Sequence, residues 1–525
     1  MSQAQIHARR WWILGVLILS LFTATLDNTV MNVALPTLAR ELSATTSQLQ
    51  WMVDAYVLVF AGLLLVAGAL SDRYGRRPAL LSGLAIFGVG SVASAFVTTA
   101  DQLILARAFM GIGAALTMPA TLSIITNVFP DHERPKAIAV WSAVSAIGIV
   151  IGPILGGWLV ESFAWSSIFL VNVPVVLVGI AAVLAIVPES KADRTPGLDP
   201  VGAALSVGGL VALVYGIIEV PSQGWTDPLI VGALAAAAIL LTAFVAWERR
   251  VAEPMLDIRL FRNMRFTAAS LSVTLVMFSL MGVLFFLTQY MQGVLGLSAF
   301  DTGVRFIPLA IGIILSAPLG PLLTRIAGAK VATAAGLVVT AGSLLLLSTV
   351  DVSSSDLLIQ AVLAIAGFGM GLAMTPATDA IMGALPKAQA GVGSAVNDTT
   401  REIGGALGVA VLGSIFSATF ANEMSGVAAG LPADVAAVVR DSIGGALAVA
   451  DQVGGVAGEA LVAAARSAFV DGMATASLIG AAVAIGGAIV AAIWLPARAT
   501  RPSDDEPAGT PEPIAAVQAG SPAVA

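Results

Sequence analysis

Fourteen apolar runs of about 20 residues dominate this chain and limit its fold more than any other feature. A helix rises ~1.5 Å per residue, so a run of this length spans the ~30 Å hydrocarbon core of a bilayer. Backbone polar groups inside a bilayer need partners within the protein, which favours helices here. We therefore expect an all-α polytopic membrane protein. Its predicted spans are residues 11–34, 51–70, 79–99, 103–127, 137–159, 166–187, 201–219, 229–247, 267–291, 303–322, 331–349, 357–377, 400–420 and 471–495.

Composition excludes several other classes of protein. The chain is 58% hydrophobic and 11% charged, whereas a soluble domain is about 25% charged. The absence of cysteine excludes disulfides and thiolate metal sites, and the two histidines, His7 and His132, fall in predicted loops. There is no basic stripe that would bind nucleic acid. We therefore expect a lipid bilayer as surroundings, no metal, no cofactor and no nucleic-acid partner.

The charges next to the spans predict the orientation. Arg9 and Arg10 before an apolar run are also typical of a signal peptide, but the run continues past Asp27 without a small-residue cleavage site. We interpret it as an uncleaved first span. With the N-terminus inside, alternation of fourteen spans places 19 of the 25 Lys and Arg in cytoplasmic segments and 4 outside. Both termini are therefore expected in the cytoplasm, with the protein in a bacterial plasma membrane.

The expected organisation is two six-helix bundles with two inserted spans between them. A weak internal repeat supports two related bundles, because Gly68 to Arg73 and Gly320 to Arg325 share the same spacing. The predicted segments are a cytoplasmic N-terminus (1–10), a bundle (11–187), the inserted pair (201–247), a second bundle (267–495) containing an outer loop (421–470), and a disordered tail (498–525). The outer loop is expected to form short amphipathic helices on the membrane surface or a packed cap.

Asp27 is an acid inside the first apolar run. A carboxylate at bilayer depth costs roughly 2.5–3.5 kcal/mol on insertion scales, so it usually has a function. Protonation removes most of that cost. The residue is therefore a candidate for linking proton uptake to a change of shape or to binding.

Arg107 and Asp54 are predicted at the same depth as Asp27. Counting ~1.5 Å per residue, Arg107 lies about 6 Å from the outer end of the fourth span, and Asp27 lies about 24 Å from the inner end of the first. Both then belong to the outer half of the bilayer, with Asp54 one turn into the second span. An Arg among carboxylates favours their charged form until a neighbour moves. The alternatives are an Arg107 that extends to the outer interface and an interfacial Asp54.

Two glycine-containing motifs are expected to govern helix movement. The turn after the second span can support both a gate held by charge pairs and the orientation of the chain; its candidate residues are Gly68, Asp72, Arg73, Gly75, Arg76 and Arg77. In the fifth span, glycines at four-residue spacing allow close packing and a proline permits a kink. Those residues are Gly148, Gly152, Pro153, Gly156 and Gly157. An ordinary packing helix is the alternative.

These motifs resemble the Major Facilitator Superfamily, and within it the fourteen-span drug:proton antiporters. The resemblance covers about residues 10–420 and includes Gly391 to Gly405. It implies two six-helix bundles plus two inserted helices, a role for Arg107 in proton coupling, and exchange rather than symport from the fifth-span motif. One departure is Ser166 after Trp165, where relatives often carry Arg.

The second half offers weaker candidates. Glu402 is a candidate proton or cation site, or part of a charge cluster at a helix start with Asp398 and Arg401. Polar and soft side chains in the spans are candidates for contact with an amphipathic cargo, although hydrogen bonding between helices is equally compatible for the glutamines. The cavity candidates are Asn32, Gln289, Tyr290, Met291, Gln292, Asn397 and Arg401.

The predicted function is proton-coupled export of small hydrophobic or cationic compounds, as in multidrug or antibiotic efflux, by a monomer that is not an enzyme. No Walker-type nucleotide-binding string occurs, and each charge that crosses 100 mV supplies about 2.3 kcal/mol. The main alternative keeps the fold and changes the cargo to a lipid, siderophore, amino acid or other metabolite. A membrane-embedded transferase would need acids or histidines clustered beside a catalytic loop, and 421–470 lacks such a cluster.

Overall fold

The computed structural model describes residues 3–130, 133–191, 199–252, 254–384 and 390–495 and contains only helices in those ranges. Thirteen helices of the described residues are long and apolar enough to cross a membrane. The 29-residue helix α5 (Arg134–Ser162), at the predicted fifth span, brings the set to the predicted fourteen. The protein is therefore a multi-pass membrane protein. The predicted tail, 498–525, lies outside the described residues.

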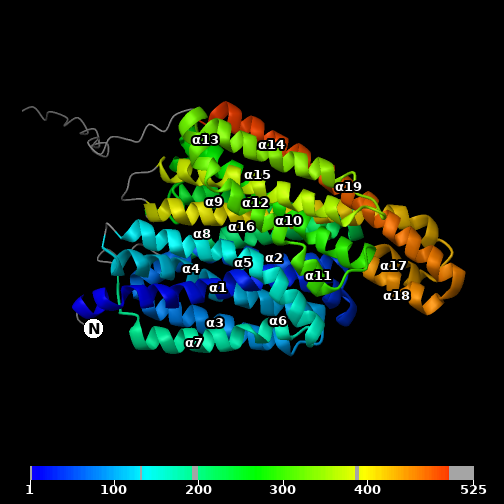
Figure 1. Ribbon diagram of the computed structural model, residues 1–525, viewed down its shortest axis with the longest axis horizontal. Coiled ribbons are helices and arrows are strands. Elements are labelled where there is room, and N and C mark those ends of the chain that lie inside the picture. Colours follow the sequence, from blue (N-terminus) through cyan, green and yellow to red (C-terminus); the bar gives the residue numbers. More distant parts are fainter. Residues whose placement is uncertain (1–2, 131–132, 192–198, 253, 385–389, 496–525) are drawn as a thin grey trace, which may run out of the picture.

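The N-terminal helices pack together on one side of the molecule (Figure 1). Helix α1 packs on α5 and α7, α2 packs on α4, and α3 packs on α4 and α7. The predicted sixth span is divided at Val171 into two helices that still form one crossing. The bounds in this half are α1 (Gln3–Glu41), α2 (Thr46–Tyr74), α3 (Arg76–Ala95), α4 (Ala100–Val128), α5 (Arg134–Ser162), α6 (Ser167–Leu170) and α7 (Asn172–Ile186).

The C-terminal helices form the other side (Figure 1). Helix α10 packs on α16 and α19, and α14 packs on α15 and α19. The bounds are η1 (Ile258–Arg262), α10 (Met264–Gln289), η2 (Tyr290–Val294), α11 (Ala299–Val304), α12 (Ile307–Ser316), α13 (Leu319–Ala327), α14 (Ala329–Leu347), α15 (Asp356–Met382), α16 (Ala390–Ala428), α17 (Ala433–Asp441), α18 (Ile443–Val453) and α19 (Gly455–Trp494).

The two inserted helices, α8 (Pro200–Gln223) and α9 (Pro228–Glu248), pack against each other. Helix α8 also contacts α2 of the first half and α16 of the second. Trp51 of α2 lies against Tyr215, with ring centroids 6.2 Å apart, and Ser414 of α16 donates a hydrogen bond to the Ile217 carbonyl at 2.8 Å. The inserted pair therefore touches both halves.

Glycines with positive φ join helices at equivalent places in the two halves. Gly75 (φ 115°) separates α2 from α3, and Gly328 (φ 90°) separates α13 from α14. An L side chain is strained at such φ values, so glycine is required there. Gly68, by contrast, lies inside α2, so the turn itself depends on Gly75.

Several span boundaries differ from the predictions for local reasons. The predicted tenth span, 303–322, is three short helices, α11, α12 and α13, with Pro318 at the last break. Proline removes a backbone donor and clashes with the preceding turn, which interrupts the helix. A π-helical turn at Tyr290–Val294 ends α10. The predicted span 400–420 is the middle of the longer helix α16, and the predicted span 471–495 corresponds to the C-terminal part of the longer helix α19.

The predicted outer loop, 421–470, is largely continuous with its flanking helices. Only α17 and α18 are separate, and they lie at the end of the bundle opposite the N-terminus (Figure 1). They pack on α16, α19 and the end of α1, and they bury Val439 and Ala446 completely. This arrangement is the packed cap rather than helices on the membrane surface.

Candidate functional site

Asp27 and Arg107 form a buried ion pair between α1 and α4. The Arg107 Nη1 contacts Asp27 Oδ2, and the two side chains are 0% and 2% exposed for Arg107 and Asp27 respectively. The predicted depth match therefore corresponds to direct contact. Arg107 does not extend to the outer interface, so that alternative is wrong. The stability of an ion pair that is shielded from water depends on its geometry and on the other hydrogen bonds that the two side chains make.

Asn172 completes the surroundings of the Asp27 carboxylate. Its Nδ2 donates to Asp27 Oδ1 at 3.1 Å and to Ser91 Oγ at 3.1 Å. Asn172, at the start of α7, is 1% exposed, and Ser91 of α3 is fully buried. Four helices thus meet at one carboxylate. Our sequence analysis missed Asn172, although an amide inside the sixth apolar run was a visible signal.

Helix α2 holds the other side of the arginine. Arg107 Nε donates to the Met52 carbonyl at 3.1 Å, and its Cζ lies 4.3 Å from the centroid of the Tyr56 ring. A guanidinium over an aromatic face gains cation–π attraction, most of all where water is excluded. Arg107 Nη2 has no hydrogen-bond partner. This nitrogen of Arg107 can therefore donate a hydrogen bond to another group in a different conformation of the protein.

Asp54 is fully buried on a different face of α2. Met52 and Tyr56 face α4, whereas Asp54 lies one helical turn from Gln50, which reaches α16. Neither carboxyl oxygen of Asp54 has a hydrogen-bond partner. The interfacial alternative for Asp54 is wrong in this structure, and Asp54 does not join the Arg107 pair.

Glu402 lies in a charged and polar group on α16. Asp398 and Arg401 interact with it electrostatically, and its own charge also acts on Tyr56 of the first half. Asn397 is 6% exposed and accepts a hydrogen bond from Thr378 at 3.2 Å. The second-half acid is therefore within electrostatic range of the residue that supports Arg107.

Three glycines of the fifth-span motif pack α5 against α1. A Cβ on Gly148 would lie 2.8 Å from Thr25 Cγ2, and a Cβ on Gly156 would lie 2.9 Å from Val30. A Cβ on Gly152 would collide with Thr29, whose hydroxyl donates to the Gly148 carbonyl at 3.2 Å. These residues hold the helix that carries Asp27.

The other end of the same motif touches the second half. A Cβ on Gly157 would collide with the Ala299 carbonyl at the start of α11. A Cβ on Gly303 of α11 would collide in turn with the Pro153 carbonyl. The two backbones meet without side chains between them, so α5 and α11 form a tight contact between the halves. We call the contact of Gly157 and Pro153 with α11 the outer seal, after the side on which the predicted orientation places it.

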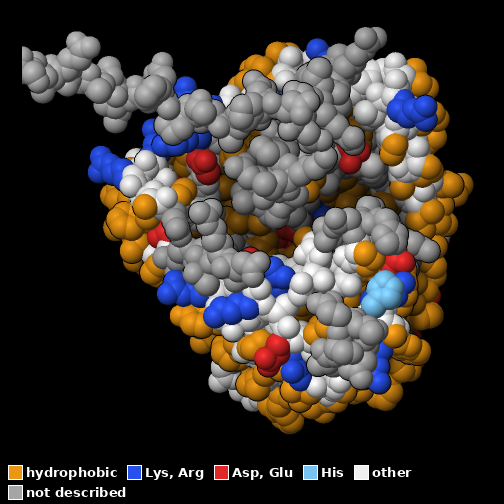
Figure 2. Space-filling view, turned by 90° about the vertical axis from the view of Figure 1, so that its left-hand side faces the viewer, with side chains coloured by type: hydrophobic (Ala, Val, Ile, Leu, Met, Phe, Trp, Pro, Cys, Tyr) orange, Lys and Arg blue, Asp and Glu red, His pale blue; other side chains and the backbone are white. Residues whose placement is uncertain are grey.

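Side chains add hydrogen bonds between the halves near the outer seal. Gln50 Nε2 donates to the carbonyls of Val409 (3.0 Å) and Ala410 (3.3 Å) on α16, and Gln292 Nε2 donates to the Val33 carbonyl on α1 at 2.9 Å. At the opposite end, the face that carries the N-terminus is hollowed at its centre, with acidic side chains inside the hollow (Figure 2). Among the described residues, the contacts between the halves lie at one end of the molecule, and the opposite end is hollowed.

The cap contributes a further contact between the halves. Asp441 at the end of α17 accepts a hydrogen bond from the Thr46 backbone N–H at 3.1 Å, and the Thr46 hydroxyl donates to the Asp441 carbonyl at 2.5 Å. Burial raises the pKa of Asp441 to about 6, the Thr46 hydrogen bond opposes that rise, and Glu219 adds to it. Asp441 therefore titrates in a mildly acidic medium.

The raised pKa predicts that acid tightens the cap. The pKa of Asp441 is higher in the contact than in free solution, so the protonated side chain stabilises the contact. This stabilisation is complete below pH 3.8 and is lost as the pH rises through about 6. We expect amide hydrogen exchange of α17, corrected for intrinsic rates, to slow as pH falls from neutral to mildly acidic. Asp441→Asn should remove this dependence.

Asp434→Asn is the matched control, because Asp434 is an exposed acid in the first turn of the same helix. It should retain the wild-type pH dependence. An Asp441→Asn variant with an unchanged dependence would contradict the assignment.

The turn at the hollowed end pairs within the first half. Asp72 accepts from Arg76 at 3.0 Å, and Arg77 lies 3.7 Å from Glu189 and donates to the Leu184 carbonyl at 2.6 Å. Arg73 lies 5.8 Å from the ring centroid of Tyr74. Among the described residues, no ion pair links this turn to the second half, in agreement with an open end.

The predicted cavity residues of α10 and η2 are buried in this conformation. Gln289 donates to Phe285 of its own helix at 3.2 Å, Tyr290 donates to the Asp351 carbonyl at 2.8 Å, and Met291 is fully buried. Gln292 donates a hydrogen bond from the second half to the first, which agrees with the alternative that the glutamines form hydrogen bonds between helices. Asn32 is half-buried on α1. Contact of these residues with cargo stays a prediction.

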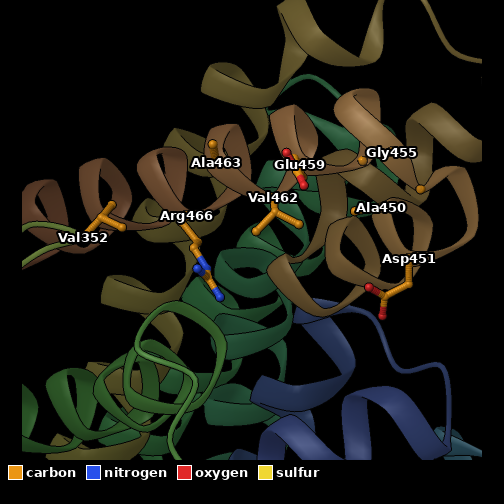
Figure 3. A pocket seen from close by; sticks show the side chains of 10 residues that line it. Val352, Ala450, Asp451, Gly455, Glu459, Val462, Ala463 and Arg466 are labelled. Carbon is orange, nitrogen blue, oxygen red and sulfur yellow. The ribbon is translucent and has the colours of Figure 1, made fainter.

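A surface hollow of about 530 Å³ lies in the cap between α18 and α19. Asp451, Glu459 and Arg466 lie on its walls among small and apolar side chains (Figure 3). None of our predicted site residues lines it. This hollow is separate from the Asp27 pair.

Comparisons with known proteins agree with this architecture. The profile of the Major Facilitator Superfamily matches residues 17–409. The multidrug efflux pump LfrA of Mycolicibacterium smegmatis is 36% identical over 508 residues, covering 94% of this chain and 97% of LfrA. The methyl viologen resistance protein SmvA of Salmonella typhimurium is 33% identical over 463 residues, covering 88% and 93%.

A solved structure shares the fold. A bacterial homologue of the human lysosomal transporter Spinster, in an inward-facing and occupied conformation, superimposes with a TM-score of 0.66. It is 18% identical, and the match covers 92% of this chain and 97% of that protein.

Proposed function

Because this chain belongs to the Major Facilitator Superfamily, we propose that it is an antiporter that exports hydrophobic and amphipathic compounds, including cations, in exchange for protons. The family match also confirms the resemblance found from the sequence motifs. Membership supports a transporter, and the absence of enzymatic activity is part of the proposal. Its place in a bacterial plasma membrane, with both termini in the cytoplasm, and its monomeric state are parts of the proposal.

The buried Asp27–Arg107 pair is the observation that carries proton exchange. Protonation of Asp27 would cancel the charge that Arg107 faces and weaken the pair. Asn172 can still bond to the neutral carboxyl, so the residue stays in place while its charge changes. The ion pair can therefore act as a two-state element whose state depends on the proton.

The closed outer seal suggests where this structure lies in the cycle. With the outer end shut and the other end hollowed (Figure 2), the contact between Asp27 and Arg107 fits the stage of the cycle that follows proton release to the cytoplasm. Cargo enters from the hollowed side. Opening of the outer seal would expose Asp27 to outside protons, and protonation would release Arg107 before the return step.

The names of the relatives support the cargo class. LfrA is named a multidrug efflux pump, and SmvA is named for resistance to methyl viologen, an organic dication. A cation fits a transporter whose coupling group is a carboxylate, because cargo and proton are both attracted to it. We propose organic cations as the first compounds to test.

Asp54 and Glu402 are further proton sites in the proposal. Asp54 is buried without a donor or a cation, so a neutral carboxyl fits its surroundings better than a carboxylate does. Glu402 lies on the second half and interacts with the Tyr56 that supports Arg107. Protonation of either acid would change the contacts between α2 and α16.

Drug accumulation tests the function. Cells that lack their own exporters should accumulate less methyl viologen when they express this protein, because a proton gradient drives export. An uncoupler should abolish the difference. Equal accumulation with and without the protein, at verified expression, would contradict the proposal for this compound class.

Gly157→Val should bias the protein against outer closure. The new side chain would collide with Ala299, and overpacking of this kind typically costs about 1–3 kcal/mol. That cost falls on the closed state alone and shifts the equilibrium between the closed and open states by roughly 5- to 150-fold. We expect greater labelling of single cysteines below the outer seal by an impermeant thiol reagent; the natural chain has no cysteine.

Gly342→Val is the control for that substitution. Gly342 is an exposed glycine of α14, with no atom near the position of an added Cβ. The substitution at Gly342 also replaces a helical glycine by valine, but it changes no contact between the halves. Equal labelling of the two variants would show that the outer seal does not depend on Gly157.

A further inference from the structure

The inserted helix pair contains two buried carboxyl groups that the transport cycle above does not use. Asp199 is the N-cap of α8, and Glu248 is the last residue of α9. They are 5% and 3% exposed. Packing of α8 on α9 brings the two side chains to the same end of the hairpin.

Each carboxyl group has one bonded oxygen and one free oxygen. Asp199 Oδ1 accepts from the Gly202 N–H at 2.7 Å and from Trp247 Nε1 at 2.8 Å. Glu248 Oε2 accepts from the Leu256 N–H at 2.9 Å. Asp199 Oδ2 and Glu248 Oε1 are buried and have no donor.

The two free oxygens face a common point. A Cβ on Gly202 would collide with Asp199 Oδ2 and would lie 2.6 Å from Glu248 Oε1. Asp199 is the titratable group whose charge acts on Glu248 among the described residues, and Arg249 and Arg250, which follow it, are exposed. Two ionised carboxylates in this position would repel each other, and no cation among the described residues is paired with either of them.

We propose that Asp199 and Glu248 share one proton, which forms an acid–carboxylate hydrogen bond at the base of the α8–α9 hairpin. The proton comes from water, and no bond other than the O–H forms. A metal ion fits the site less well. Ca²⁺ and Mg²⁺ take six or more oxygen ligands, no group of three or more such side chains exists among the described residues, and N–H donors already occupy the other two oxygens.

The shared proton makes the hairpin base sensitive to pH. It joins the start of α8 to the end of α9, and through Leu256 it also ties down the segment that leads to α10. Loss of the proton in alkaline medium leaves two like charges together and loosens the base. Because α8 contacts both α2 and α16, this change acts where the inserted pair meets both halves.

Thermal unfolding of the full-length protein in nanodiscs, from mildly acidic to mildly alkaline buffer, tests the proposal. The wild type should lose stability as pH rises. Glu248→Gln should lose this component, because an amide donates to Asp199 without titrating. Glu41→Gln, at an exposed acid at the end of α1, should behave as the wild type.

Infrared spectra supply the second readout. The stretching band of a buried protonated carboxyl should weaken in both Glu248→Gln and Asp199→Asn and persist in Glu41→Gln. Overlapping pH profiles of the wild type and Glu248→Gln, or an unchanged band, would overturn the proposal. Stabilisation of the wild type by sodium, absent from Glu248→Gln, would assign the site to a cation instead. Methyl viologen export by Glu248→Gln should persist, which separates this result from failure of the proposed function.

Discussion

Asp27→Asn is expected to reduce pH-driven export of methyl viologen from membrane vesicles to the level of vesicles without the protein. The amide has nearly the shape of the carboxyl group, and its one oxygen can still accept a hydrogen bond from Arg107 or from Asn172, so the protein should insert. It cannot bind and release a proton across neutral pH. The measurement is uptake into inverted vesicles after a pH step, normalised to the amount of inserted protein.

Asp471→Asn is the control for this loss. Asp471 is an exposed acid of α19, and the same change of charge there should leave export intact. Full proton-driven exchange by Asp27→Asn would refute the coupling role of this residue, whatever the control shows.

Arg107→Met is expected to give the largest loss of stability. It removes one partner of a pair whose side chains are almost inaccessible to water, and breaking such a buried pair costs about 3–5 kcal/mol because the other charge is left alone. The methionine also loses the hydrogen bond to Met52 and the contact with Tyr56. The free energy of unfolding of purified protein measures the effect.

A double variant separates charge from packing. Asp27→Asn with Arg107→Met contains neither charge, so it should recover a large part of the stability that Arg107→Met loses. The double-mutant cycle then gives the coupling energy of the pair. A double variant no more stable than Arg107→Met would show that the arginine acts through packing alone.

The number and approximate position of the spans could be predicted because hydrophobic length is a direct physical requirement of the bilayer. Hydrophobic length does not predict where each helix ends. Ala-rich and Gly-rich segments with scattered charges continue α16 and α19 beyond the bilayer, and hydropathy does not distinguish such a continuation from a loop. The break at Pro318 and the π-helical turn at Tyr290 depend on local packing.

The depth of Asp27 and Arg107 could be predicted from helix rise, but the rotation of each helix could not. Asp54 lies on a different face of α2 from Met52 and Tyr56, because two residues along a helix correspond to more than half a turn. The sequence offered charged residues as the evident candidates, so the neutral Asn172 was passed over. The contacts of Gly157 with α11 involve backbone atoms distant in sequence, which a glycine spacing alone does not reveal.

The central claim is that Asp27 exchanges a proton when cargo binds. The most direct measurement is proton release by purified protein in weakly buffered solution, followed with a pH indicator as methyl viologen is added at each of a series of pH values. The wild type should release protons in a saturable way, and Asp27→Asn should bind the compound with this release abolished. Equal proton release by the two proteins would contradict the account.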